Sequence, residues 1–102
     1  LLALDAAEQL VIIDVDTEPN NDQILRGIAH YDWFIRNMPI VRRMYQGRVI
    51  NFSVQPRLFL IAPSFSPLLM CAAKRLEPLK VCCFVYRAVL MSGGIGVFFE
   101  RA

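Results

Sequence analysis

The chain has 102 residues, 56% of them hydrophobic and 20% charged, with a formal net charge of +2 at pH 7. This length favours a single domain over residues 1–102, and an apolar fraction above the roughly 45–50% of ordinary soluble domains excludes a disordered chain. The longest uncharged run, residues 58–73, is shorter than the ~20 residues of a membrane span and contains two prolines, so we expect no membrane insertion.

The first residues of the chain indicate how it is processed, and its cysteines indicate the redox state of its compartment. Residues 1–5 contain no initiator methionine and no basic segment, which argues against both a signal peptide and a natural start. We therefore expect an N-terminal piece to precede Leu1. The cysteines are odd in number, and Cys82 and Cys83 adjoin within an apolar run, where neighbouring strand residues point to opposite faces. This pattern favours free, buried thiols in a reducing cytoplasm.

The first half of the chain predicts a hairpin followed by a helix. Residues 1–4 and 10–16 are apolar and rich in strand formers, and five residues connect them. A helical period of four, three and four residues follows and predicts a helix over about residues 22–37; it is carried by Ile24, Ile28, Tyr31 and Ile35. Pro39 limits this helix, and residues 40–45 predict a further short helical turn.

The second half predicts four strands and one helix. The strands are expected at residues 49–54, 57–62, 79–90 and 95–99. Ser66 and Pro67 suit the N-cap and first position of a helix, which we expect over residues 67–76 with its end before Pro78. Because the strands lack clean polar alternation and helices lie between them, we expect an α/β fold, a mixed central sheet flanked by helices on more than one face.

The net charge conceals two halves of opposite sign. Residues 1–33 hold seven acids against Arg26, whereas residues 34–102 hold ten bases against two acids. An acidic cluster beside a basic remainder suits a metal site next to a phosphate-binding surface, and it also suits ordinary solvated faces. The best basic patch consists of Arg36, Arg42, Arg43 and Arg48. Contact with nucleic-acid phosphates and simple solubilisation both remain open for this patch.

Asp14 and Asp16 are the strongest candidates for chemistry. They stand two residues apart at the end of an apolar strand, so both carboxylates project from one face while Ile13 and Val15 project from the other. Two carboxylates on one face can hold a Mg²⁺ or Mn²⁺ ion, which offsets their mutual repulsion. The alternative is that both acids are simply exposed at a frayed strand end.

At this point the chain resembles a known family. Residues 1–16, followed by a helix with Tyr31 and Trp33, resemble the central part of the PD-(D/E)XK nuclease superfamily, the restriction-endonuclease-like fold. The resemblance is to domains of archaeal mismatch and branched-DNA endonucleases, in which a hairpin leads into an apolar strand ending in acid-x-Lys. The second half of those domains is similar to residues 56–66, 72–76 and 85–87 here. The resemblance implies a DNA substrate, a Mg²⁺ or Mn²⁺ cofactor and Asp14 as a metal ligand.

Several residues depart from the family pattern. The first acid of the family lies on a strand ahead of Leu1 and is not in this chain. Asp16 stands where the family has a lysine that activates water and stabilises charge on the phosphate, a task that an aspartate cannot perform. Gly27 lies near the position of a helix residue that is often glutamine. We therefore expect a degenerate domain that is catalytically inactive and has no cofactor, and that binds nucleic acid through its basic face.

Two alternatives stay open. An active metal-dependent nuclease would need Asp14 with nonstandard partners, namely Glu18 or Asp22 as further ligands and Arg26 in place of the lost lysine; an acidic helix start with an ordinary ion pair explains the same residues. His30, the only histidine, is expected at the surface or between helices. The third interpretation is a structural module that forms a homo-oligomer, in which a second copy covers exposed apolar edges.

Overall fold

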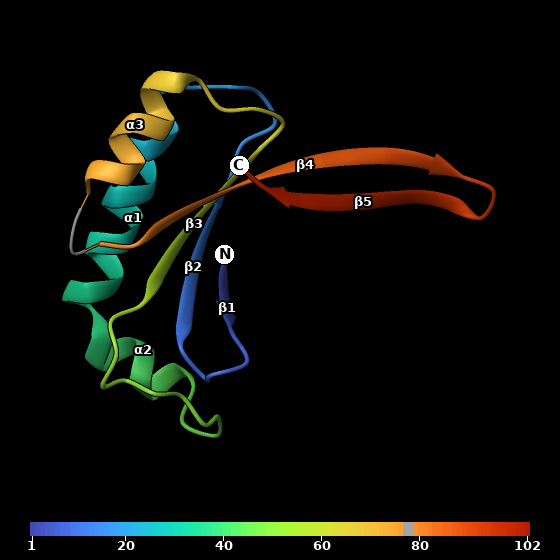
Figure 1. Cartoon of the computed structure of the whole chain (residues 1–102). Helices are drawn as coiled ribbons and strands as arrows, with labels where there is room; N and C mark the ends of the chain where they lie inside the picture. Colours follow the sequence, from blue (N-terminus) through green and yellow to red (C-terminus); the bar gives the residue numbers. More distant parts are fainter. Residues whose placement is uncertain (77–78) are drawn as a thin grey trace.

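The computed structural model describes residues 1–76 and 79–102 and shows one five-stranded mixed sheet with helices against it (Figure 1). The strands lie in the order β1-β2-β3-β4-β5. In chain order the elements are β1 (Leu2–Leu4), β2 (Leu10–Val15), α1 (Gln23–Arg36), α2 (Met38–Met44), β3 (Arg57–Ala62), α3 (Pro67–Arg75), β4 (Val81–Met91) and β5 (Gly94–Arg101). The mixed α/β class expected from the sequence is confirmed.

The hairpin and the central helices also match the expectations. β1 pairs antiparallel with β2, with Leu2 opposite Ile12, and the Asp5 carboxylate accepts hydrogen bonds from backbone N–H groups in the connecting turn. α1 falls within the predicted limits. α3 begins where the cap predicted it, because the Ser66 hydroxyl accepts a hydrogen bond from the Leu69 N–H at 3.1 Å. α3 ends at Arg75 with Leu76 as its C-cap, one residue short of the predicted range 67–76 and before Pro78 as expected.

The strand expected at residues 49–54 is wrong. This segment forms turns, and the Asn51 N–H donates to the Glu8 carbonyl at 2.8 Å. The physical reason is that this contact, together with the hydrogen bond from the Ser53 N–H to the Asn51 side-chain oxygen, closes a turn where the prediction had extended backbone. The final hairpin is longer than predicted, since β4 extends to Met91 and β5 to Arg101.

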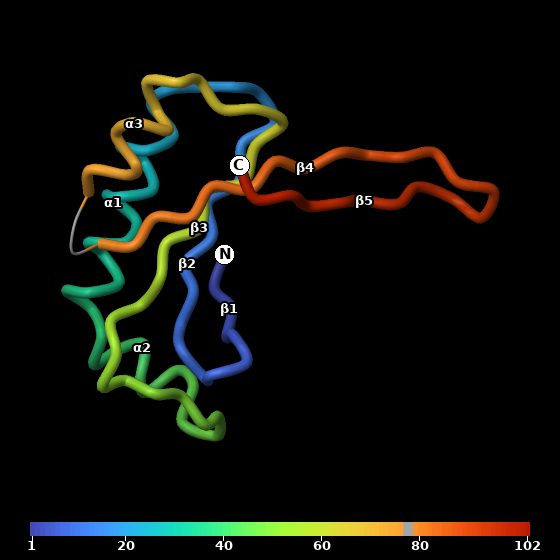
Figure 2. The backbone as a smooth tube through the Cα atoms, viewed as in Figure 1, coloured from blue at the N-terminus to red at the C-terminus, as the bar shows by residue number. Residues whose placement is uncertain are grey.

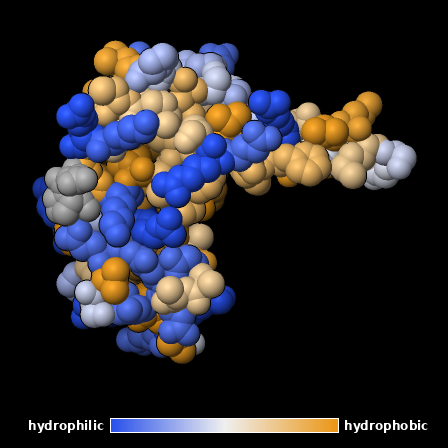
Figure 3. All heavy atoms as spheres, in the orientation of Figure 1, coloured by the Kyte–Doolittle hydropathy of each residue, from blue (hydrophilic) through white to orange (hydrophobic). Residues whose placement is uncertain are grey.

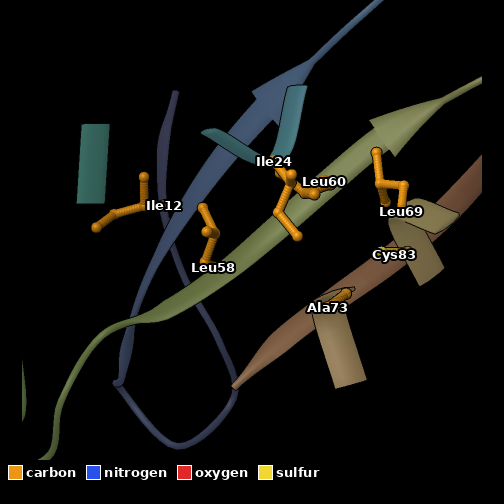
Figure 4. Packing of buried hydrophobic residues seen from close by; sticks show 7 residues of the cluster. All are labelled: Ile12, Ile24, Leu58, Leu60, Leu69, Ala73 and Cys83. Carbon is orange, nitrogen blue, oxygen red and sulfur yellow. The ribbon is translucent and has the colours of Figure 1, made fainter. Parts of the chain in front are cut away.

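α1 and α3 cover the same face of the sheet. Their buried residues join alternate residues of β2, β3 and β4 in one core cluster, labelled in Figure 4: Ile12, Ile24, Leu58, Leu60, Leu69, Ala73 and Cys83. The expectation of helices on more than one face is therefore not met by the described residues. Parallel crossovers of the usual right hand that advance in one direction, from β2 to β3 to β4, place both helices on one side.

The two adjacent cysteines lie on opposite faces, as the strand pattern predicts. Cys83 belongs to the core cluster, and burial raises the pKa of its thiol to about 11, so the thiol is neutral at physiological pH. Cys82 points to the other face, where the guanidinium groups of Arg57 and Arg101 each lie 3.6 Å from its sulfur. All three cysteines are free, and Cys71 is exposed rather than buried.

The outer part of the β4–β5 hairpin projects from the rest of the molecule. Figures 1 and 2 show these two strands leaving the sheet and running away from the helices, with a tight turn at the far end. We call residues 88–99 the arm. Gly94, just after the turn, has a φ of +139°, a conformation that side-chain-bearing residues rarely adopt. Separately, no helix in the described part of the chain is long and apolar enough to cross a membrane.

Candidate functional site

The two aspartates predicted to share a face do so. Asp14 lies near the end of β2 on the side that α1 covers and is only 6% exposed. Asp16 follows the strand, where its N–H donates to the Ile61 carbonyl of β3 at 2.8 Å. The frayed, solvent-exposed strand end is thus not what the structure shows. β3 pairs with β2 as far as the Asp16 N–H, so both acids stay fixed to the sheet beside the first turns of α1.

Arg26 on α1 bridges the two carboxylates. Its Nη2 lies 3.0 Å from Oδ2 of Asp14 and 3.1 Å from Oδ2 of Asp16, and its Nε lies 3.2 Å from the same Asp14 oxygen. The Arg26 side chain is 41% exposed, so the guanidinium closes the site from the solvent side. The arrangement is a clamp: one cation holds two anions that would otherwise repel each other.

The pKa shifts follow from these contacts. The Glu18 N–H, which donates to Oδ1 of Asp16, and the Arg26 guanidinium together lower the pKa of Asp16 below its ordinary value. Asp14 and Asp16 raise the pKa of Arg26, so its positive charge is permanent. The site therefore consists of a fixed cation and at least one carboxylate that stays ionised at neutral pH.

Two further α1 residues join the site: His30, which the sequence analysis expected at the surface or between helices and which is exposed, and Gln23, which it did not single out. Nδ1 of His30 lies 3.5 Å from Oδ1 of Asp14, because His30 is four residues beyond Arg26 and shares its helix face. Gln23 is fully buried, and its amide donates to the carbonyls of Asp14 and Ile61. Its Oε1 has no partner among the described residues. The four-residue spacing between Arg26 and His30 is the sequence signal that could have placed His30 beside this site.

The residues as arranged do not fit the implied Mg²⁺ or Mn²⁺ ion. Such ions need several oxygen ligands at open positions, whereas the two carboxylates here are both engaged by a guanidinium that carries its own positive charge. Within residues 1–76 and 79–102, no three His, Cys, Asp or Glu side chains gather closely enough to hold a metal ion. Glu18 and Asp22 are exposed, and Glu18 reaches the site through its backbone N–H.

Gly27 lies where α1 packs closely on β3, and this contact leaves no room for a longer side chain. A Cβ atom at this position would lie 2.8 Å from Cδ2 of Leu60, which is closer than real Cβ contacts. The glycine thus lets α1 approach β3 closely, and this approach is what brings Arg26 over Asp14. A glutamine near this place, as the family resemblance would have it, does not fit the packing of this chain.

The predicted basic residues lie at the other end of α1. Arg26 and Arg36 are ten residues apart on one helix, about 15 Å along its axis. Arg36 pairs with Asp32, and the Arg42 guanidinium lies 4.8 Å from the centre of the Phe52 ring. Arg43 is exposed on α2, and Arg48 lines a cavity of about 300 Å³ with Tyr45 and apolar residues of β1. The structure thus separates the acidic site from the basic patch.

Comparisons with protein-family models, with curated proteins and with solved structures find no match to this chain. The function must therefore be inferred from the site itself.

Proposed function

We propose that this chain is a degenerate nuclease-like domain of the restriction-endonuclease-like fold that binds nucleic acid without hydrolysing it. The observation that carries the proposal is the Arg26 clamp on Asp14 and Asp16. A metal-dependent nuclease needs an ion that polarises the phosphate and supplies hydroxide from bound water. A guanidinium balances the charge of the two carboxylates and does neither.

The order of elements supports the family part of the proposal. An antiparallel hairpin leads into the apolar strand that ends at Asp14, a helix follows, and the next strand lies parallel beside it. This is the arrangement that the family resemblance implies for the strand carrying the metal-binding acid. In this chain the same strand end stabilises the fold, because the clamp fastens α1 to β2.

The basic patch supports the binding part. In the described chain, none of Arg42, Arg43 and Arg48 takes part in an ion pair, and Arg42 and Arg43 are exposed neighbours in the last turn of α2. Guanidinium groups outside ion pairs can bind phosphate oxygens, and each neutralised phosphate releases counterions. Arg36 contributes less, since Asp32 already engages it. A cytoplasmic location completes the proposal and suits the three free thiols.

Binding is tested by fluorescence anisotropy with single- and double-stranded DNA at several salt concentrations. Replacing Arg42 and Arg43 by alanine is expected to weaken binding about tenfold or more and to reduce the salt dependence by the equivalent of about two phosphates. The matched control replaces Lys74 and Arg75, two adjacent exposed bases in the last turn of α3, and is expected to bind as the parent does. Equal losses in both variants would refute a specific surface on α2.

Hydrolysis is tested with the same DNA in Mg²⁺ and Mn²⁺. The parent and Asp14→Ala are both expected to leave the DNA intact. Cleavage by the parent that Asp14→Ala abolishes would instead establish the alternative, an active metal-dependent nuclease. Arg26→Ala belongs in the same assay, since removing the guanidinium frees both carboxylates. It is also expected to be inactive, because Asp16 still stands where the family has its lysine.

A further inference from the structure

The arm is the most exposed apolar part of the molecule. Figure 3 shows it as a narrow projection dominated by hydrophobic residues. Its large apolar side chains are between 41% and 87% exposed, and they are Val89, Leu90, Met91, Ile95, Val97, Phe98 and Phe99. Four of them, Ile95, Val97, Phe98 and Phe99, lie on β5, the edge strand of the sheet. Singly exposed apolar residues need no explanation, but a contiguous patch of this size does.

The arm is also incomplete as a sheet. An isolated two-stranded ribbon is marginally stable in water and becomes stable when further strands or a helix pack on it. β5 is the last strand of the sheet and pairs with β4 only, so its outer edge is free in the described structure. No residue from 88 to 99 carries a charge that would oppose edge pairing, and Arg87 and Glu100 bound the stretch on either side.

We propose that the arm is the interface of a homodimer, in which the β5 strands of two copies pair antiparallel about a two-fold axis. The four strands of the two arms then form one continuous sheet. A second copy fits because a two-fold axis matches a free edge with an identical free edge and closes the assembly at two. An uncharged arm offers no complementary charge to nucleic acid or to an acidic or basic peptide.

Strand geometry selects the register. A two-fold axis perpendicular to the sheet keeps each residue on its own face, so facing residues must share a face. Centring the axis on Val97 places Ile95 opposite Phe99 of the second copy. These side chains are 71%, 53% and 57% exposed for Ile95, Val97 and Phe99. In this register Glu100 faces Gly94 and Arg101 faces Gly93 of the second copy. No charged side chain is then placed against an apolar one across the new edge.

A disulfide across the axis tests this register. In a Cys71→Ser background, which removes the exposed native thiol, Val97→Cys places two thiols on directly facing residues. Facing residues of antiparallel strands have Cα atoms about 4.5–5.5 Å apart, which is within disulfide range. We expect mild oxidation to convert this variant to a covalent dimer. Leu90→Cys is the control, since it is 87% exposed in the arm but lies on β4, away from the free edge. Equal crosslinking of the two variants would overturn the register, and no crosslinking of either would overturn the interface.

The oligomeric state tests the interface itself. Light scattering of the full chain is expected to give a dimer, because a four-stranded sheet is more stable than a lone two-stranded ribbon. Val97→Lys is expected to raise the dimer dissociation constant at least about tenfold, because an edge lysine opposes strand pairing. Its far-UV circular dichroism is expected to match the parent, since the arm lies outside the core. A parent that stays monomeric at about 100 µM, or that floats with neutral lipid vesicles as a monomer, would refute the proposal. So would assembly into open-ended oligomers.

Discussion

Leu60 and Leu90 occupy similar apolar strand segments and have opposite surroundings. Leu60 in β3 is fully buried, whereas Leu90 in β4 is 87% exposed. The difference is the cover: α1 and α3 lie over Leu60, and the part of β4 that carries Leu90 has left the sheet beyond the reach of both helices (Figure 1). A helix layer therefore buries Leu60, whereas the same residue type in the arm has no such cover and stays exposed.

The two regions also differ in what holds them in place. The covered region combines a close helix approach at Gly27, a continuous core cluster and the Arg26 clamp. The arm is held by its own ladder, which runs from Ala88 opposite Val97 to Met91 opposite Gly94. We expect substitutions to be costly in the first region and nearly neutral for the stability of the monomer in the second.

The largest difference is expected from matched leucine truncations. Leu60→Ala removes a side chain with no exposure and leaves a cavity, so the free energy of unfolding should fall by about 3 kcal/mol. Leu90→Ala should lower it by less than about 0.5 kcal/mol, measured below the dimer dissociation constant. Urea unfolding of both variants measures the contrast. Similar losses in the two would mean that the arm is covered in solution even in the monomer.

Sequence reasoning located the elements of the covered region well because their signals are local. The period of α1, the cap at Ser66 and the acid spacing at Asp14 and Asp16 each depend on residues within a few positions. What it missed depends on neighbours far along the chain. The failed strand at residues 49–54 required knowing that Asn51 would bond to Glu8, far earlier in the chain, and the one-sided helices required knowing the strand order.

A second contrast concerns the glycine that lets α1 approach the sheet. Gly27→Gln would force a side chain into Leu60, so we expect the free energy of unfolding to fall by about 2 kcal/mol, even after the gain in helix propensity. Ala29→Gln puts the same side chain at an exposed position of the same helix and should change stability by less than about 0.5 kcal/mol. Thermal or urea unfolding compares them. A neutral Gly27→Gln would show that α1 can shift outward without loss.

The third contrast sets the clamp against a surface ion pair. Arg26→Ala leaves the buried Asp14 carboxylate without its main partner, so we expect a loss of about 1–2 kcal/mol in the free energy of unfolding. Arg36→Ala breaks an exposed pair with Asp32 and should cost less than about 0.5 kcal/mol. Asp14→Asn added to Arg26→Ala should recover part of the loss in a double-mutant cycle. An additive cycle would mean that the two side chains do not interact.

The site shows the same limit of sequence reasoning. The shared face of Asp14 and Asp16 followed from strand geometry, and Arg26 was considered as a positive charge near them, yet its bridging position could not be deduced. That position depends on how closely α1 packs on β3, and Gly27 permits close packing because it has no side chain to contact Leu60. Gln23 was missed because a buried glutamine bonding to two strand ends has no sequence pattern of its own.

The smallest expected effect is the response of the clamp to acid. The Glu18 N–H and Arg26 lower the pKa of Asp16 below 3.8, its ordinary value and the one expected in the unfolded chain. A carboxylate with a lowered pKa in the folded state contributes stability above its unfolded pKa and loses that contribution as the pH falls through the folded pKa. Asp16→Asn should therefore be less stable than the parent at neutral pH, and the difference should shrink as the pH falls below 3.8 and through the lowered pKa of Asp16.

Urea unfolding of the parent and of Asp16→Asn across this pH range measures the convergence. Asp22→Asn is the matched control, because Asp22 is an exposed acid at the start of α1 whose side chain makes no cap hydrogen bond. Its difference from the parent should stay small at every pH. A gap between the parent and Asp16→Asn that persists in acid would contradict a charge effect. Asp16 would then stabilise the fold through packing and not through its charge. Charge would no longer be a reason for the covered region to be more stable than the uncharged arm.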